Sequence, residues 1–175
     1  IDRQVVTIIT QMLVPEDDPA VNNPTKYIGQ FYTKEQADSF LQERGWQMKQ
    51  DGDRGWRRVV PSPTPYRAVE AETIKKLVAE GVVVIAGGGG GIPVYIDKNG
   101  NLEGMDAVID KDLASAIIAS EIGAGILCIL TSIDRVFVNY GRPDEKALGT
   151  VTLSEIKKYY DEGHFPPGSM GPKIS

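Results

Sequence analysis

The chain has 175 residues, of which 19 are basic and 24 acidic, so its formal net charge at pH 7 is −5. A dedicated nucleic-acid or anionic-membrane binder would instead carry a basic excess. With 41% hydrophobic and 25% charged residues, the composition is that of a globular protein rather than a disordered one. Cys128 is the only cysteine, which excludes a disulfide framework and a zinc site built from several cysteines.

No apolar run reaches the roughly 18 residues that a membrane-spanning helix needs, and the longest, residues 122–130, is interrupted by two glycines. We therefore expect a soluble cytoplasmic protein that binds neither nucleic acid nor a membrane. The chain opens on Ile1, without Met or a signal-type segment, and stops at Ser175. These ends favour a fragment of a longer protein.

The first third of the chain combines strand and helix signals. The β-branched, apolar segment 4–13 predicts a strand, and the polar segment 15–25 predicts a loop. Segments 46–50 and 56–60 flank a glycine-containing turn at 51–55, which predicts a hairpin. Together these elements predict a small α+β appendage.

A helix is predicted between that first strand and the hairpin. Thr33 and Gln36 have the spacing of a capping box, and Gly45 supplies a left-handed stop. One face of this helix carries the apolar side chains of Ala37, Phe40 and Leu41. Three alternate prolines at 61–65 then predict a stiff connector between two subdomains.

Helices and buried strands alternate in the rest of the chain. Helices are predicted over 68–80 and 112–124, and a second capping box, Thr152 to Glu155, opens another that ends near Gly163. The continuous apolar runs 82–86 and 126–130 predict strands buried on both faces. This alternation predicts an α/β sandwich with a largely parallel sheet.

The glycine run from Gly87 to Gly91 directly follows a predicted buried strand, and Ile92-Pro93 stiffens its exit. A glycine turn at a strand end lets backbone N–H groups approach an anion with no side chain in the way. The run matches neither the P-loop nor the GxGxxG pattern. It therefore favours an anion-binding loop, with a purely structural turn as the alternative.

Asp110, Lys111 and Asp112 stand where a helix begins. Aspartates are common at a helix N-terminus, but a lysine there opposes the helix dipole. Lys111 thus indicates an anionic ligand, with ordinary helix capping as an equal alternative.

Lys26 and Lys173 each lie on a proline-containing loop. With Lys111 they make three lysines near glycine or proline turns, a set that suits phosphoryl transfer because that reaction needs fixed cations around the moving group. His164 has no nucleophile pattern beside it, so we expect a structural role for it. Arg57 and Arg58 are expected to form a pair on a strand face.

Five sequence blocks occur in the order found in carbamate kinases, which belong to the amino-acid kinase superfamily. They are Pro24-Thr25-Lys26, Arg57 to Pro63, Gly88 to Val94, Val108 to Asp112, and Glu162 to Lys173. The chain resembles this family over almost all of its 175 residues. The family's chain is longer, so the resemblance implies that an N-terminal part with a Gly-Gly-Asn segment and a short C-terminal end are missing, and that this polypeptide alone is not a competent kinase.

The resemblance implies a three-layer αβα sandwich with a mainly parallel sheet and a homodimeric assembly. Residues 4–64 would form a protruding lid, and residues 65–175 the C-terminal, nucleotide-binding part of the kinase domain. The implied reaction is reversible phosphoryl transfer between carbamoyl phosphate with MgADP and carbamate with MgATP. The family usually makes ATP in this way at the end of arginine fermentation.

The resemblance also assigns residues to the site, position by position. Lys26 would reach from the lid to carbamoyl phosphate, and Lys111 and Lys173 would flank the transferred phosphoryl group. Asp112, with Asp110, would orient those lysines. The substrate's carbamate end would bind the backbone amides of Gly88, Gly89, Gly90 and Gly91. The nucleotide pocket would be lined by Thr131, Asp134, Met170 and the loop leading to Lys173, and Mg²⁺ would accompany the nucleotide, with no residue assigned as its ligand.

Two departures from the family pattern leave this assignment intact. Tyr27 stands where the family generally has Pro, and Gly87 lengthens the glycine run by one residue. Two alternatives remain open: another acyl-phosphate kinase, acting on acetylglutamate, glutamate or aspartate, and an inert module that only binds a nucleotide. The blocks around Lys26 and Arg57 to Pro63 disfavour the other kinases.

Overall fold

The computed structural model describes residues 2–166 and 170–175. The chain divides into two compact units, Ile1–Ala124 and Gly125–Ser175, which are described separately below. The predicted loop that leads to Lys173 includes residues 167–169, which lie outside the described residues. Among the described residues, no helix combines the length and the apolar character that crossing a membrane requires.

The α/β part of the first unit is built around parallel strand pairs. Its strands are β1 (Val5–Thr7), β2 (Gln11–Leu13), β6 (Arg67–Ala68), β7 (Val83–Ile85), β8 (Ile92–Ile96) and β9 (Leu102–Gly104). β1 pairs in parallel with β7, and β2 in parallel with β8. Antiparallel strands flank the second pair, which gives the order β6-β2-β8-β9. The parallel pairs at the centre confirm the predicted α/β class with a mainly parallel sheet.

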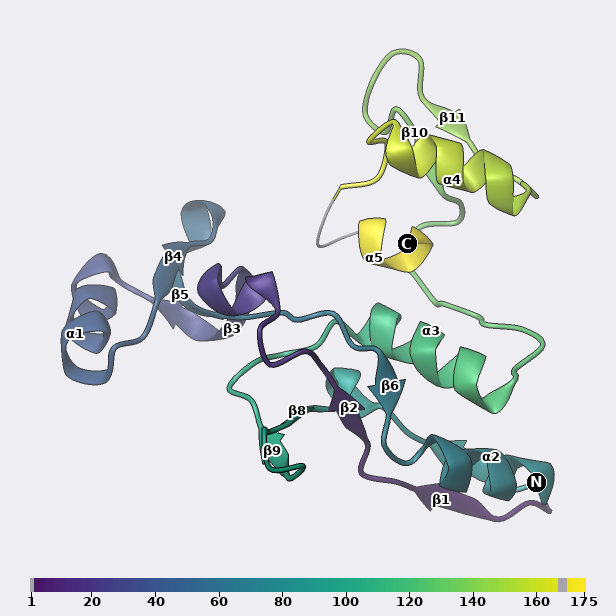
Figure 1. Cartoon of the computed structure of the whole chain (residues 1–175). Helices are drawn as coiled ribbons and strands as arrows, with labels where there is room; N and C mark the ends of the chain where they lie inside the picture. Colours follow the sequence, from purple (N-terminus) through teal and green to yellow (C-terminus); the bar gives the residue numbers. More distant parts are fainter. Residues whose placement is uncertain (1, 167–169) are drawn as a thin grey trace. The chain divides into compact units, whose positions relative to one another are not determined.

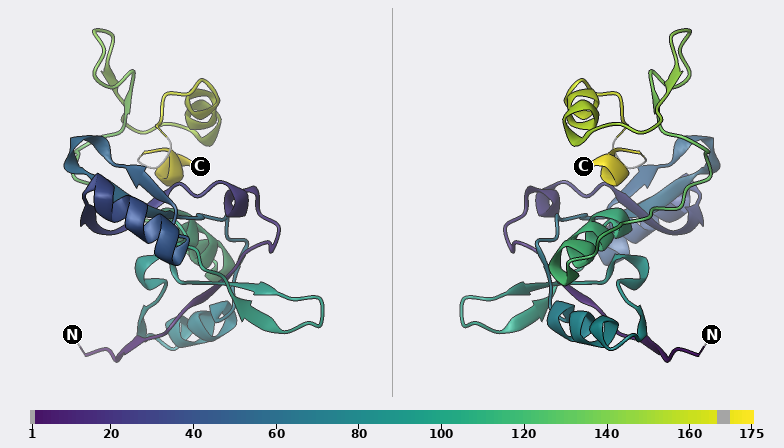
Figure 2. Two further views of the ribbon diagram at one scale, coloured as in Figure 1. Left: turned by 90° about the vertical axis from the view of Figure 1, so that its left-hand side faces the viewer. Right: turned by 90° about the vertical axis from the view of Figure 1, so that its right-hand side faces the viewer.

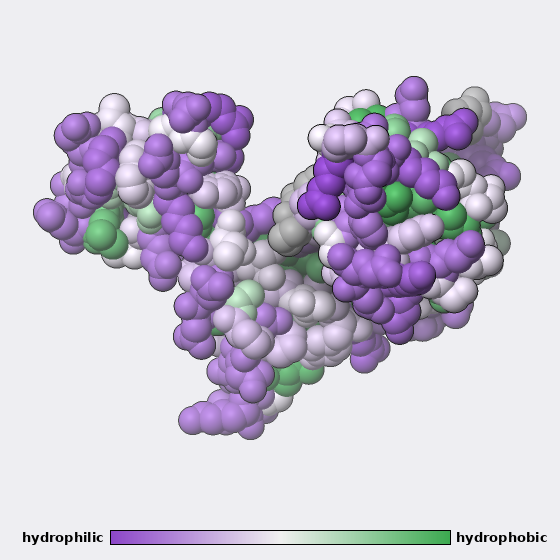
Figure 3. All heavy atoms as spheres, turned by 90° about the horizontal axis from the view of Figure 1, so that it is seen from above, coloured by the Kyte–Doolittle hydropathy of each residue, from purple (hydrophilic) through white to green (hydrophobic). Residues whose placement is uncertain are grey.

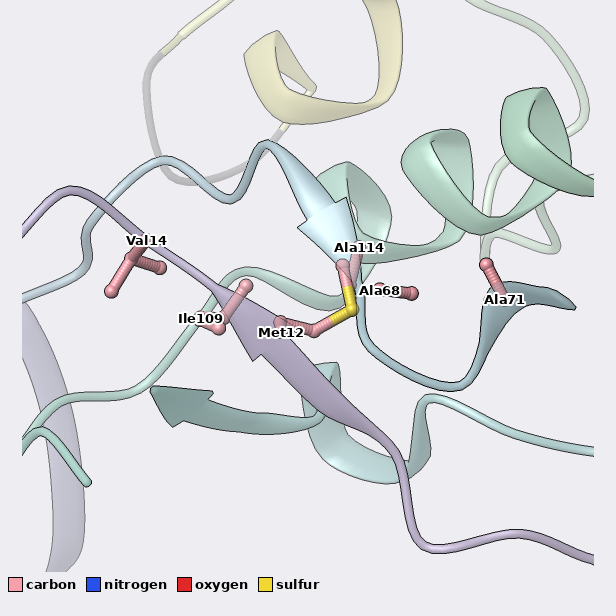
Figure 4. Packing of buried hydrophobic residues seen from close by; sticks show 6 residues of the cluster. All are labelled: Met12, Val14, Ala68, Ala71, Ile109 and Ala114. Atoms are coloured by element: carbon pink, nitrogen blue, oxygen red, sulfur yellow. The ribbon is translucent and has the colours of Figure 1, made fainter. Parts of the chain in front are cut away.

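Two helices, α2 (Ala71–Ala79) and α3 (Lys111–Ile122), pack against each other and against these strands. Figure 4 shows the core that these helices and strands form. In it the Met12 side chain of β2 points toward Ala68 of β6 and Ala114 of α3. The buried members of this core are Met12, Val14, Ala68, Ala71, Ile109 and Ala114. Because Ile109 comes directly before Asp110, the N-cap of α3, the core holds the backbone at the start of that helix.

Residues 26–60 of the predicted lid form a three-stranded antiparallel sheet with one helix, and this part is called the lid below. Its strands β3 (Lys26–Tyr32), β4 (Met48–Gln50) and β5 (Trp56–Val60) have the order β3-β5-β4, and a 3-10 turn, η2 (Gly52–Arg54), joins the last two. In Figure 1 this sheet and α1 (Lys34–Arg44) stand apart from the strands of the core. The predicted capping box at Thr33 is present in both directions. A second 3-10 turn, η1 (Pro19–Asn22), precedes β3.

The second unit is small and mostly irregular. It contains the antiparallel strands β10 (Phe137–Val138) and β11 (Lys146–Ala147), followed by the helices α4 (Leu153–Asp161) and α5 (Gly171–Ile174). Val138, Leu148 and Phe165 form its buried centre. Both views of Figure 2 show α4 as a regular helix, and the predicted capping box at Thr152 opens it.

Several predicted elements differ from the structure. Residues 4–13, which the sequence placed in the lid as a single strand, form β1 and β2, and their pairing with β7 and β8 puts them in the α/β part. The helix predicted from residue 68 begins at Ala71, because Arg67 and Ala68 form the short strand β6. The strands β8 and β9, which flank a turn at residues 97–101, were not predicted.

Two predictions of buried strands were wrong. Residues 126–130 form no strand, and Ile126 and Leu130 are 86% and 89% exposed. The strand predicted at 82–86 exists as β7, but Val83 and Ile85 are exposed rather than buried. An apolar β-branched run favours burial in a sheet. Whether it is buried depends on which other helices and strands cover it, and the run itself does not determine that.

Candidate functional site: the glycine loop and the start of helix α3

The glycine run forms a tight loop between two strands of the α/β part. A 3-10 turn, η3 (Gly88–Gly90), follows β7 and leads into β8. Gly90 and Gly91 donate their N–H groups to the carbonyls of Gly87 and Gly88, at 2.8 and 3.2 Å. Gly88 and Gly89 are exposed, and a Cβ on either would meet no atom within 4 Å. The leading N–H groups of a helical turn have no acceptor inside that turn, so an anion can bind the amides of these two exposed glycines.

The far end of the loop is packed too closely for any side chain. A Cβ on Gly90 would lie 2.4 Å from the carbonyl oxygen of Ile109, and a Cβ on Gly91 would lie 2.6 Å from Cγ of Met12. Both glycines also have positive φ, +115° and +82°, where non-glycine residues are strained. Only glycine fits at these two positions, because Gly90 lies against the backbone of Ile109 and Gly91 lies against Met12.

This contact places the loop directly beside the start of α3. The would-be Cβ of Gly90 lies 3.5 Å from the backbone nitrogen of Lys111, the first residue of the helix. Asp110 is the N-cap, and its carboxylate accepts the N–H of Asp112 at 2.9 Å. Lys111 is exposed, whereas Asp110 and Asp112 are buried. Nζ of Lys111 lies 3.9 Å from the carboxylate of Asp112.

Lys26 connects the lid to the start of α3. It is the first residue of β3, and its ammonium group donates to the carboxylate of Asp110 at 2.9 Å. A second lid residue, Arg58 of β5, pairs with Asp106 at 2.6 Å. The amide of Val108 donates to the carbonyl of Pro61 at 3.0 Å. The segment 105–111 is thus held by the lid and also contacts the glycine loop.

The charges around Asp110 change its acidity. Burial raises the pKa of this carboxyl group, but the hydrogen bonds from Lys26 and the Asp112 amide, with the charges of Lys26 and Lys111, outweigh burial. The pKa of Asp110 therefore lies below its ordinary value, and the group is ionised at neutral pH. An ionised N-cap beside two lysines gives the site fixed charges of both signs.

The structure thus brings four of the predicted site residues, Lys26, Asp110, Lys111 and Asp112, together with the predicted glycine loop, Gly88 to Gly91, in the first unit. The remaining predicted residues belong to the second unit. Thr131 and Asp134 are exposed in irregular backbone, Met170 packs against the apolar cluster of that unit, and Lys173 lies in the short helix α5. Their proposed work on a nucleotide stays a prediction.

His164 and the two arginines make structural contacts. His164 lies edge-on to the Tyr159 ring at 5.6 Å, with its Nε2 3.4 Å from the carboxylate of Glu162. Arg57 lies over the ring of Phe31, as expected for a residue on a strand face. Arg58, however, reaches the segment before α3, which the sequence did not indicate.

Thr10 is a residue near the site that sequence reasoning missed. It lies between β1 and β2, is only 3% exposed, and its hydroxyl accepts the N–H of Gly87 at 2.8 Å. The only signal in the sequence was a hydroxyl residue inside an apolar segment, which by itself indicates no contact with a loop 77 residues away.

Comparison with known proteins identifies the family. The model of the amino acid kinase family matches residues 24–175. The chain belongs to the amino acid kinase family. Over 174 residues it is 53% identical to the carbamate kinase of Thermococcus kodakarensis and 51% identical to that of Staphylococcus haemolyticus, covering 99% of this chain but only 55% and 56% of those relatives. The chain thus spans about half the length of the curated relatives it matches.

Two solved structures are similar to most of the chain. A structure from Aeropyrum pernix has a TM-score of 0.91 at 46% identity, and covers 99% of this chain and 56% of that one. A carbamate kinase from Giardia lamblia bound to AMP-PNP has a TM-score of 0.87 at 44% identity, covering 98% and 54%. These similarities confirm the amino-acid kinase fold and the resemblance to carbamate kinases that the five sequence blocks indicated.

Proposed function

We propose that this chain is part of a carbamate kinase and that the glycine loop and the start of α3 bind the phosphoryl donor or acceptor. One observation carries the proposal: Gly90 packs against the backbone at residues 109–111, which puts the exposed glycines of the loop near Lys111, while Lys26 reaches the same point from the lid. Backbone amides with flanking ammonium groups suit an anionic substrate. Similarity to carbamate kinases supports carbamoyl phosphate and carbamate as the substrate class.

The chemistry of the reaction calls for this distribution of charge. In the direction that makes ATP, an oxygen of the ADP β-phosphate forms a bond to the phosphorus of carbamoyl phosphate. The bond from that phosphorus to the carbamate oxygen breaks, and carbamate leaves with the electron pair. Both reactants are anions, so the approach is opposed by repulsion that positive groups offset. Carbamate oxygen is already anionic in the reverse direction, so neither direction needs a general base.

Each residue of the site receives a role under this proposal. Lys111 and Lys173 are assigned to the charge on the transferred phosphoryl group, and Lys26 to carbamoyl phosphate. Asp110 and Asp112 hold the lysines in position. The nucleotide contacts are assigned to Thr131, Asp134, Met170 and Lys173.

Mg²⁺ is the proposed cofactor, bound together with the nucleotide. Among residues 2–166 and 170–175, no group of three or more His, Cys, Asp or Glu side chains is arranged to hold a metal ion. Mg²⁺ in phosphoryl-transfer sites commonly uses substrate phosphates, waters and only one or two carboxylates, and Asp110 and Asp112 are the acidic residues at this part of the site. When bound, the ion would neutralise charge on the nucleotide phosphates. We further propose that the whole protein is a homodimer, that it is located in the cytoplasm and that it makes ATP in arginine fermentation.

The decisive test measures ATP formation from carbamoyl phosphate and ADP by the longest native polypeptide that contains this sequence. Lys111→Ala should lower turnover by roughly two orders of magnitude or more, which is the usual effect of losing a charge contact in the transition state. Lys98→Ala is the matched control, because Lys98 is an exposed lysine in the turn between β8 and β9. Near-normal turnover in Lys111→Ala would contradict the assigned role.

The same protein separates the two alternatives. Another acyl-phosphate kinase would consume ATP with acetylglutamate, glutamate or aspartate and would make no ATP from carbamoyl phosphate. An inert module would bind a nucleotide and turn over neither set of substrates.

A further inference from the structure

We infer that Thr10 is a positioning residue for the substrate, because it holds both ends of the glycine loop. This inference rests on the proposed function of that loop. Thr10 lies in the connection between β1 and β2, far from Gly87 in sequence, and is almost completely buried. It belongs to none of the five sequence blocks and has no assigned role.

The hydroxyl of Thr10 fixes the entrance of the loop. Its oxygen accepts the N–H of Gly87 at 2.8 Å and donates its own hydrogen to the carbonyl of Ile8 at 3.1 Å. Because the hydrogen is directed at Ile8, a lone pair of the oxygen is left to receive the Gly87 amide. Gly87 has φ +66°, and this bond holds the turn that starts there.

The backbone of Thr10 fixes the exit of the loop. Its carbonyl oxygen accepts the N–H of Ile92 at 2.8 Å. The same oxygen would lie 3.1 Å from a Cβ on Gly91. One buried residue therefore holds the backbone on both sides of Gly88 and Gly89, which are the exposed glycines of the loop.

A loop held in this way presents its amides in one arrangement before the substrate arrives. Such preorganised N–H groups stabilise charge without the cost of reorganisation. The hydroxyl of Thr10 touches no substrate atom in this proposal and acts only through the Gly87 amide. Losing the hydroxyl leaves that amide without its acceptor and lets the entrance of the loop shift.

The test compares Thr10→Val with Thr10→Ser in the longest native polypeptide that contains this sequence. Valine keeps the shape of threonine but removes the hydroxyl, whereas serine keeps the hydroxyl. Thr10→Val should lower kcat/KM for carbamoyl phosphate roughly tenfold to a hundredfold and leave KM for ADP within about twofold. Thr10→Ser should restore most of the loss. Thr7→Val is the matched control, because Thr7 is exposed in β1.

A second measurement does not depend on activity. Hydrogen exchange of the Gly87 amide should be at least about tenfold faster in Thr10→Val than in the wild type or in Thr10→Ser, as expected for a lost hydrogen bond. Unchanged exchange of Gly87 together with an unchanged kcat/KM for carbamoyl phosphate would overturn the inference. A fall in kcat alone, with both KM values unchanged, would also overturn it, because that result indicates only a smaller folded fraction. A wild-type protein with no activity would contradict the proposed function instead, and the exchange of Gly87 would still decide whether Thr10 holds the loop.

Discussion

The glycine loop and the lid both contact the start of helix α3, but different forces hold them there. The loop is held by buried backbone contacts, in which Gly90 lies against the carbonyl of Ile109 and Thr10 bonds the Gly87 amide. The lid is held largely by charge, through Lys26 with Asp110 and through a second ion pair. In the view of Figure 3, the lid on the left presents mostly hydrophilic side chains.

The two kinds of contact differ in how much displacement they tolerate. Close packing is short-ranged and has little tolerance for displacement, so the loop keeps one geometry. An ion pair at a partly exposed surface changes little in energy over small shifts and is weakened by salt. Under the proposed function, a lid held in this way would adjust around a substrate while the loop stays fixed. Substitutions in the packed contact of the loop should therefore destabilise the protein most, and substitutions in the exposed ion pair of the lid should destabilise it least.

Gly90→Ala should have the largest effect, because it attacks the packed contact. The new methyl group would lie 2.4 Å from the Ile109 carbonyl oxygen, at a backbone φ of +115°. Overpacking and backbone strain together should lower the free energy of unfolding by about 3 kcal/mol or more. Urea denaturation at neutral pH measures this difference.

Gly88→Ala is the matched control two residues earlier. A Cβ on Gly88 would meet open space, and this glycine does not have a positive φ. Its free energy of unfolding should stay within about 1 kcal/mol of the wild-type value. Equal losses in the two variants would show that the contact with residue 109 does not fix the loop.

The local elements of the fold could be predicted from the sequence, because their signals lie within a few residues of each other. The capping boxes at Thr33 and Thr152 and the glycine at residue 45 mark helix ends correctly. The N-cap of α3 is equally local, since Asp110 bonds the amide two residues ahead. The same signals correctly predicted that Lys111 stands at the start of a helix.

The rest depends on contacts between distant parts of the chain. The pairing of β1 with β7 joins residues almost eighty positions apart, and no local pattern assigns residues 4–13 to the α/β part rather than to the lid. The hydroxyl of Thr10 finds its partner over a similar distance. Burial of the apolar runs was predicted wrongly for the same reason, because exposure depends on which elements cover them.

Asp110→Asn should have an intermediate effect, because it removes the charge that holds Lys26. Asparagine caps a helix about as well as aspartate does, so the start of α3 is preserved. The free energy of unfolding at pH 7 should fall by roughly 1 to 2 kcal/mol, as for a charge-assisted hydrogen bond in a partly buried place. Asp110→Ala should lose about 1 kcal/mol more, because it also removes the cap.

The effect of pH provides the control for that interpretation. The pKa of Asp110 is lowered in the folded protein, so the unfolded chain takes up its proton first as the pH falls. The stabilisation is therefore complete above the ordinary carboxyl pKa of about 4 and is lost as the pH falls through the lower, folded-state value. Wild type and Asp110→Asn should differ at pH 7 and converge in acid. A difference that stays constant down to pH 3 would contradict a charged contact.

Asp106→Asn should have the smallest effect on global stability, because Asp106 is highly exposed where it meets Arg58. Exposed ion pairs contribute less than about 1 kcal/mol, and salt screens them. Arg58 itself lies over the Trp46 ring, 4.7 Å from its centroid, and that contact survives the substitution. The free energy of unfolding should therefore change little at physiological ionic strength.

The pair should matter locally, for the seating of the lid. The amide of Val108 donates to the carbonyl of Pro61 where the lid joins the core, so its hydrogen exchange reports whether that junction is closed. At low salt, Asp106→Asn should speed this exchange roughly threefold, and high salt should remove the difference, because screening weakens the wild-type pair as well. Asp53→Asn, an exposed carboxylate within the lid, should change neither value. If Val108 exchanges at the wild-type rate in Asp106→Asn at low salt, charge at Asp106 does not seat the lid, and Lys26 alone provides its electrostatic attachment.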